Sequence, residues 1–130
     1  MKELLLVALG GALGSVARWQ LGGAILHHTV NWRFPLGTFI VNVAGCMTAG
    51  AIAGLITRHD MFSPAARLFL LTGLLGGFTT FSAFGVESMY LLRRGEFMVL
   101  AFYVTLSVVA GIGGLVLAFR IIPSSQPHHP

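Results

Sequence analysis

Residues 73–84 read GLLGGFTTFSAF, in the middle of a stretch that is otherwise apolar enough to form a membrane-spanning helix. Gly76 and Gly77 weaken a helix. Thr79 and Thr80 follow them, and threonine is β-branched with a hydroxyl that can bond backbone carbonyls. Backbone groups freed at membrane depth must be satisfied by protein, water or an ion. The sequence therefore predicts a helix that is broken near Gly76–Thr80.

The composition of the whole chain is that of an integral membrane protein. Of its 130 residues, 55% are hydrophobic and only 9% are charged, which is far from the balance of a soluble domain. A spanning helix needs about 20 mostly apolar residues. Four such stretches, at about 4–27, 34–57, 65–91 and 97–122, use nearly the whole chain.

We therefore expect an all-α, multi-pass protein of the cell inner (plasma) membrane, with one four-helix transmembrane domain over residues 1–122. Residues 123–130 are rich in Pro, Ser and His and are predicted to be a disordered tail. His128 and His129 as metal ligands are the less favoured alternative for this tail.

Other classes of protein are poorly supported. The formal net charge is +4, but the basic residues are scattered between the spans, so no nucleic acid partner is expected. Cys46 is the single cysteine and lies in an apolar span, so neither a disulfide nor a cysteine metal site is predicted. The chain has no nucleophile–base pair, metal cluster or phosphate loop, which argues against an enzyme.

The distribution of Lys and Arg gives almost no preferred direction of insertion. Lys2, Arg58, Arg67 and Arg120 fall on the side of the termini, whereas Arg33, Arg93 and Arg94 fall on the opposite side. Because the Lys/Arg imbalance sets the orientation of a membrane protein, we expect the chain to insert in both directions. Two opposed copies can then pair about an axis in the membrane plane. Four thin helices have little interior of their own, which also favours a partner.

Two polar side chains in the first two spans are candidate site residues. Arg18 at membrane depth must face protein or water, because a buried cation there is costly. It is predicted either to snorkel or pair with Glu87 of a neighbour, or to form an electropositive vestibule that attracts anions. Asn42 follows Thr38 by four residues and precedes Gly45 by three, on a small-residue face. Its amide supplies two donors, for an interhelical bond or for an ion.

The third and fourth spans carry the remaining candidates. Phe81 and Phe84 share one helical face next to Ser82, and such rings usually make core or lipid contacts. Their positive edges can nevertheless help to replace the water around a small anion. Tyr103 and Ser107 present hydroxyls along one stripe, for interhelical bonding or for an anion path. Glu87 would repel an anion, so we expect it near a mouth, without an assigned role.

The residues quoted so far match a known family over almost the entire chain. Three motifs carry the likeness: GGALGSVAR at 10–18, PLGTFIVNVAG at 35–45 and GLLGGFTTFSAF at 73–84. In this order and at this length, the chain resembles the Fluc (CrcB) fluoride channels. The resemblance implies an antiparallel, dual-topology homodimer with two fluoride pores and a buried structural Na⁺ at the dimer interface.

The resemblance also implies residue roles. Backbone carbonyls of Gly76 and Thr79 from both subunits would hold the sodium ion. Asn42 would donate to fluoride, Phe81 and Phe84 would line the pore, and Arg18 would line the vestibule. Less securely, Ser82 lies beside the pore, and Tyr103 and Ser107 look like the polar track of the fourth helix. Where the family commonly reads FSTF, this chain has Ala83 in place of Thr, which removes a hydroxyl, and conduction is expected to change.

The predicted function is passive, selective export of cytoplasmic fluoride. Fluoride is small and tightly hydrated, so a pore must replace its water with numerous donors of moderate strength. The main alternative is a small dual-topology multidrug or cation exporter, which would need a carboxylate well inside its cavity. The first span offers only Glu3, at its edge. A second alternative is a non-conducting assembly subunit whose polar residues only join helices.

Overall fold

The computed structural model describes residues 1–124 and is all-helical within them. The elements are α1 (Lys2–Thr29), α2 (Leu36–His59), α3 (Pro64–Arg67), the π-helix η1 (Leu68–Leu75), α4 (Gly76–Phe78), α5 (Phe81–Arg93) and α6 (Phe97–Ile121). Four segments are long and apolar enough to cross a membrane: α1, α2, the third span Pro64–Arg93, and α6. The four predicted spans are therefore confirmed, within a few residues at each end. The tail prediction for 125–130, with His128 and His129, lies outside the described residues.

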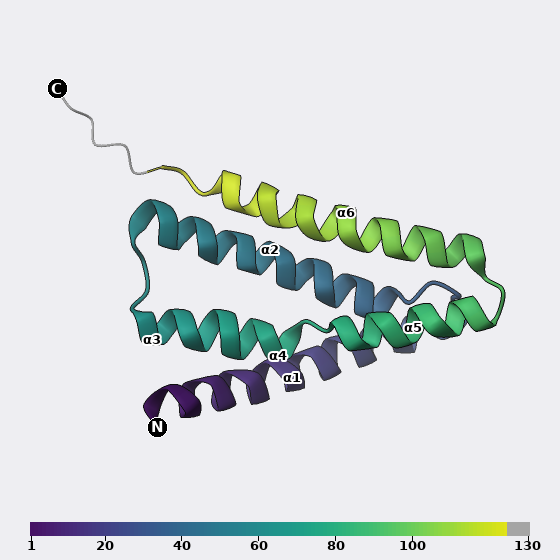
Figure 1. Ribbon diagram of the computed structural model, residues 1–130, viewed down its shortest axis with the longest axis horizontal. Coiled ribbons are helices and arrows are strands. Elements are labelled where there is room, and N and C mark those ends of the chain that lie inside the picture. Colours follow the sequence, from purple (N-terminus) through teal and green to yellow (C-terminus); the bar gives the residue numbers. More distant parts are fainter. Residues whose placement is uncertain (125–130) are drawn as a thin grey trace.

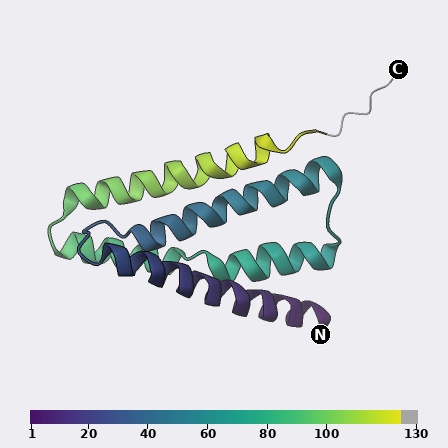
Figure 2. The same ribbon diagram turned by 180° about the vertical axis from the view of Figure 1, so that it is seen from behind.

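The four spans run up and down past one another, with α2 between α6 and the third span (Figure 1). The view from behind shows α1 lying against the third span, on the side away from α6 (Figure 2). Accordingly, α1 packs mainly on η1 and α4, and α6 packs mainly on α2. The start of α1 and the end of α6 lie at the same end of the molecule (Figure 1), as an even number of spans requires.

Glycines allow these helices to approach closely. A Cβ on Gly14 would collide with the carbonyl of Leu74, and a Cβ on Gly77 would collide with the backbone of Gly11. A Cβ on Gly50 would meet the carbonyl of Leu115 in the same way. The small residues of the sequence thus have the packing role that they commonly have in lipid, where backbones must come close to gain contact area.

The single chain has a very small core. Its buried hydrophobic residues are Val41, Ile52, Leu75, Leu91 and Tyr103, and no polar or charged residue in the described range falls in the buried class. Large apolar side chains on every span are exposed. The surface of one chain is therefore suited to lipid or to another protein surface.

The break in the third span lies later than the glycines suggest. Gly76 and Gly77 remain helical in α4, whereas Thr79 (φ −82, ψ 156) and Thr80 (φ −150, ψ 116) are extended. The prediction of a break near Gly76–Thr80 is confirmed, but Gly77 serves close packing, Gly76 has room for a side chain, and the threonines carry the break. The π-helix that precedes it has no signal that the sequence reasoning recognised.

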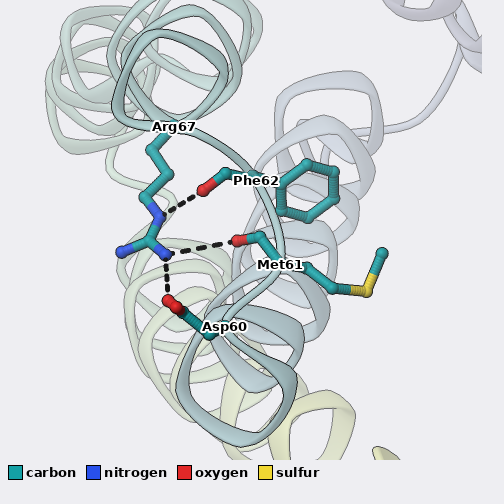
Figure 3. Close-up of polar contacts among 4 residues, drawn as sticks. All are labelled: Asp60, Met61, Phe62 and Arg67. Atoms are coloured by element: carbon teal, nitrogen blue, oxygen red, sulfur yellow. Dashed lines mark hydrogen bonds and ion pairs between the residues drawn. The ribbon is translucent and has the colours of Figure 1, made fainter.

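The loop between α2 and α3 shows how the surface end of a span is closed (Figure 3). Asp60 (φ 47) and Phe62 (φ 71) have left-handed backbone conformations. Arg67 folds back over the loop: its Nε donates to the carbonyl of Phe62 at 2.9 Å, and its Nη2 donates to the carbonyl of Met61 at 3.4 Å and to Asp60 Oδ1 at 2.8 Å. Ser63 caps α3, because its Oγ accepts from the Ala66 N–H at 3.3 Å.

Candidate site at the break of the third span

Asn42 of α2 replaces the hydrogen-bond partners that the backbone loses at the break. Its Oδ1 accepts from the Thr80 N–H at 2.8 Å, and its Nδ2 donates to the Thr80 carbonyl at 3.0 Å. A neighbouring β-strand pairs with an extended residue in the same way. The amide has two N–H groups, so one remains after this pairing. The interpretation of Asn42 as an interhelical bond is therefore confirmed, and its donation to an ion stays a prediction.

Arg18 and Ser15 of α1 hold the carbonyl of Gly77 on the other side of the break. Arg18 Nε donates to it at 3.1 Å and Ser15 Oγ at 3.4 Å. In a continuous helix this carbonyl would accept from the Phe81 N–H. Arg18 thus neither forms an ion pair with Glu87 of its own chain nor extends away from the protein. It also lines an open cleft of about 530 Å³ between α1, α2 and α5.

Two further hydroxyls support the ends of the interrupted helix. Thr80 Oγ1 accepts from the Ala83 N–H at 3.2 Å and so caps α5. Thr79 Oγ1 donates to the Leu75 carbonyl at 2.8 Å, on the last turn before the break. The hydroxyls of Thr79 and Thr80 therefore form local hydrogen bonds with the backbone, as expected from the sequence.

The carbonyls of Gly76 and Thr79 differ from those of Gly77 and Thr80. Among residues 1–124, neither the Gly76 nor the Thr79 oxygen accepts a hydrogen bond. In a continuous helix these oxygens would accept from the N–H groups of Thr80 and Ala83. Here, however, the Thr80 N–H donates to Asn42 and the Ala83 N–H donates to Thr80 Oγ1. Neutral carbonyl oxygens are suitable ligands for hard cations of low charge. The described residues contain no cluster of three or more His, Cys, Asp or Glu side chains that could hold a metal, so a cation here would depend on backbone oxygens.

A second, smaller pocket of about 280 Å³ lies beside the break and is lined by Asn42, Phe81, Phe84, Ser107 and Cys46, among others. The rings of Phe81 and Phe84 lie with their centroids 5.5 Å apart. Ser107 Oγ is buried and has no hydrogen-bond partner in the region that the structure describes. The structure thus brings together four of the predicted pore residues, from three spans, in one pocket.

The other predicted residues lie around this pocket. Phe81 is 84% exposed in the single chain, so its ring is covered only on the side that meets Phe84. Ser82 is also exposed, and its Oγ lies 3.2 Å from Thr80 Oγ1 instead of lining the pocket. Ala83 lines the larger cleft and not the pocket, so a hydroxyl at this position would lie on the cleft side of α5.

Tyr103 is fully buried in the chain, and its hydroxyl binds the Glu87 carboxylate. The Tyr103 ring contacts Phe84 and Phe34, with centroid separations of 5.0 and 5.3 Å. Tyr103 Oη donates to Glu87 Oε2 at 2.6 Å, and Thr38 Oγ1 donates to Glu87 Oε1 at 2.7 Å. Thr38 was not among the partners predicted for Glu87. The available signal was its spacing of four residues from Asn42, which puts both side chains on one face of α2.

Comparison with known proteins identifies the family. The sequence profile described as CrcB-like protein, Camphor Resistance (CrcB), matches residues 5–119. A fluoride-specific ion channel FluC from Methylobacillus flagellatus is 48% identical over 122 residues, which cover 94% of this chain and 95% of that protein. A protein of the same name from Nitrobacter winogradskyi is 43% identical over 119 residues, covering 92% of this chain and 94% of the relative.

A third FluC protein, from Rhizobium etli, is 46% identical over 119 residues, covering 88% of this chain and 94% of the relative. These matches span all four helices and nearly the full length of each relative, and they bear out the resemblance inferred from the three motifs. They argue against an exporter or an enzyme. The chain belongs to the CrcB/FluC family of fluoride-specific ion channels, a family of membrane proteins.

Proposed function

We propose that the protein is a fluoride-selective channel that passively exports fluoride from the cytoplasm across the plasma membrane. The observation that carries this proposal is the pocket in which Asn42, Phe81, Phe84 and Ser107 meet beside the break. Its polar groups are neutral donors, and its apolar walls are aromatic rings. Such a lining can replace the hydration shell of a small anion without binding the anion too tightly to release it.

Two features of the pocket favour an anion over a cation. Ser107 Oγ has no partner within the described part of the chain, and Asn42 has a spare N–H after pairing with Thr80. Furthermore, α5 begins at Phe81, so the positive end of its helix dipole lies at the pocket. Tyr103 contributes by holding the Phe84 ring, and Ser82 borders the path. Arg18, in the larger cleft, supplies positive potential at the entrance.

The expected driving force is electrical. Hydrogen fluoride enters a cell as a neutral weak acid and ionises at cytoplasmic pH, which traps the anion inside. The negative interior then favours exit of the anion by about 2.3 kcal/mol per 100 mV. The channel needs no coupled ion and no chemical step.

Fluoride efflux from proteoliposomes tests this function. Purified protein in vesicles loaded with equal concentrations of fluoride and chloride should release fluoride, measured with a fluoride-selective electrode, and retain chloride. Phe81→Ile keeps an apolar side chain but removes the ring, and it should slow fluoride release while the assembly remains intact on gel filtration. Equal release of both halides would refute selectivity, and wild-type efflux from the Phe81 and Phe84 isoleucine variants would remove the rings from the mechanism.

The working unit is proposed to be an antiparallel homodimer with two pores. The small core, the nearly complete exposure of Phe81 and the even distribution of Lys and Arg all support a second, inverted copy. Labelling of a single cysteine placed near the N-terminus, in a Cys46→Ala background, should then reach half of the molecules from each side of a sealed membrane. Labelling from one side only would exclude the inverted arrangement.

The dimer is further proposed to contain a structural sodium ion, held by the carbonyl oxygens of Gly76 and Thr79 from both subunits. Neither oxygen accepts a hydrogen bond from the described residues, which supports the fit, and bound sodium would supply the positive charge that they lack. If this is correct, the thermal unfolding midpoint in detergent should be higher in sodium than in choline chloride. Equal midpoints in the two salts would argue against the site.

A further inference from the structure

Arg18 contacts the break through one particular nitrogen. The donor to the Gly77 carbonyl is Nε, at 3.1 Å, and no terminal guanidinium nitrogen shares that contact. Ser15, one turn earlier on α1, donates to the same oxygen at 3.4 Å. The rest of the guanidinium faces the cleft of about 530 Å³. Arg18 therefore presents two separable properties: a hydrogen-bond donor at the break and a positive charge in the cleft.

The packing of α1 brings this donor to the break. Gly11, Gly14 and Arg18 lie on one face of α1, since they are spaced by three and four residues. Gly77 lies against the backbone of Gly11, and a Cβ on Gly77 would collide with that backbone. Two turns further along α1, the Arg18 side chain folds back and reaches the Gly77 carbonyl. The close glycine contact therefore sets the register between the helices that makes the Arg18 bond possible.

The bond fills a need that the break creates. The Gly77 oxygen has lost its helical partner, and a carbonyl without a partner at membrane depth is costly. On the other side of the break, Asn42 satisfies both backbone groups of Thr80. The two extended residues, Thr79 and Thr80, are thus held from α1 on one side and from α2 on the other. Loss of the hydrogen bonds from either helix would allow α4 to move relative to α5.

We propose that Arg18 is a positioning residue: its Nε–H, more than its charge, holds the Gly77 carbonyl so that the break keeps its extended form and Phe81 begins α5 at the pocket. The effect of this hold on conduction rests on the proposed fluoride function. Its effect on the backbone does not, since the hydrogen bond would order residues 77–81 whatever the pore carries.

Three substitutions separate the donor from the charge. In Arg18→Gln, Nε2 stands at the same number of bonds from Cα as the arginine Nε, so the donor is kept and the charge is lost. In Arg18→Met, a methyl group stands at that place, and both are lost. In Arg18→Lys, the charge is kept but the ammonium lies one bond further out.

Hydrogen exchange tests the role of the Arg18–Gly77 hydrogen bond directly. The wild type and the three variants are compared in detergent, by mass spectrometry of peptides that cover residues 77–83. Arg18→Met should speed exchange of these amides at least about tenfold, the equivalent of about 1.4 kcal/mol, and Arg18→Gln should restore most of the protection. If Gln exchanges as fast as Met, or if Met exchanges as slowly as the wild type, the positioning role is wrong.

Fluoride efflux, measured at low and at high ionic strength, then shows how the Arg18–Gly77 hydrogen bond affects conduction. We expect efflux through Arg18→Met to fall about tenfold or more at both ionic strengths, and Arg18→Gln to stay within a few-fold of wild type at high salt, where charge is screened. Wild-type efflux through Lys together with complete loss in Gln would show that the charge is what matters. If the wild type itself fails to conduct fluoride, the proposed function fails, and the exchange data still decide the role of Arg18.

Discussion

Two arginines close two backbone interruptions in this molecule, one at the surface and one inside a membrane span. Arg67 Nε donates to the Phe62 carbonyl in the α2–α3 loop (Figure 3), and Arg18 Nε donates to the Gly77 carbonyl at the break. The loop arginine also forms an ion pair with Asp60 at 2.8 Å, whereas the break arginine has no carboxylate partner among residues 1–124. The same nitrogen thus makes the same kind of bond in two different surroundings.

The difference between the two sites lies in what can replace the arginine. The Asp60 side chain is 96% exposed and that of Arg67 is 34% exposed, so water can bond the loop groups when the arginine is absent. At the break, the surroundings are helices α1 and α2, the cleft that the rest of the Arg18 guanidinium faces and, in the membrane, lipid. A hydrogen bond contributes little where water is an alternative partner and far more where none is present. The hydrogen-bond distances alone therefore do not show which arginine contributes more to stability.

The largest effect is expected at Asn42, which makes two bonds to one residue of the break. Asn42→Leu has a similar volume but leaves the N–H and the carbonyl of Thr80 without their partner. We expect the free energy of unfolding to fall by about 2–4 kcal/mol and fluoride efflux to be lost. Thermal unfolding in detergent and the electrode assay measure these two quantities.

Asn42→Asp is the matched control for this prediction. Its carboxylate can still accept from the Thr80 N–H, but it cannot donate and it would repel fluoride. Conduction should therefore be lost with a smaller loss of stability than in the leucine variant. Wild-type stability of Asn42→Leu would mean that the break does not depend on the α2 side.

The smallest effect is expected at Arg67. Arg67→Met removes the ion pair and the bonds to the loop carbonyls, and exposed ion pairs of this kind contribute about 0–1 kcal/mol. The thermal midpoint should therefore change by much less than in Arg18→Met, and efflux should be unchanged. An effect of Arg67→Met equal to that of Arg18→Met would remove the contrast between the loop and the break.

Much of the fold could be predicted from the sequence because apolar length and glycine spacing act locally. The four spans follow from hydropathy, and the broken third span follows from the run of Gly76, Gly77, Thr79 and Thr80. The location of the break within that run could not be predicted in the same way. It depends on Asn42 and Arg18 offering bonds from other helices, and a sequence pattern within one segment does not contain that information.

The sequence predicted which residues belong to the candidate site better than it predicted which of them are in contact. Asn42, Phe81, Phe84 and Ser107 do share a pocket, as motif and stripe suggested. The partners of Glu87, however, come from α2 and α6, and their meeting depends on how the helices rotate against each other. That rotation is set by the close contacts at glycines. A single sequence shows where the small residues are, but it does not show which helix each of them faces.

The break also has a consequence for how the third span crosses the membrane. At 1.5 Å per residue, Pro64–Phe78 and Phe81–Arg93 are each only about 20 Å long, too short to cross a hydrocarbon layer of about 30 Å alone. The two halves must therefore lie end to end to cross the membrane, joined by the extended pair Thr79 and Thr80. Arg18 of α1 and Asn42 of α2 support this joint from two sides, through the Gly77 carbonyl and the backbone of Thr80.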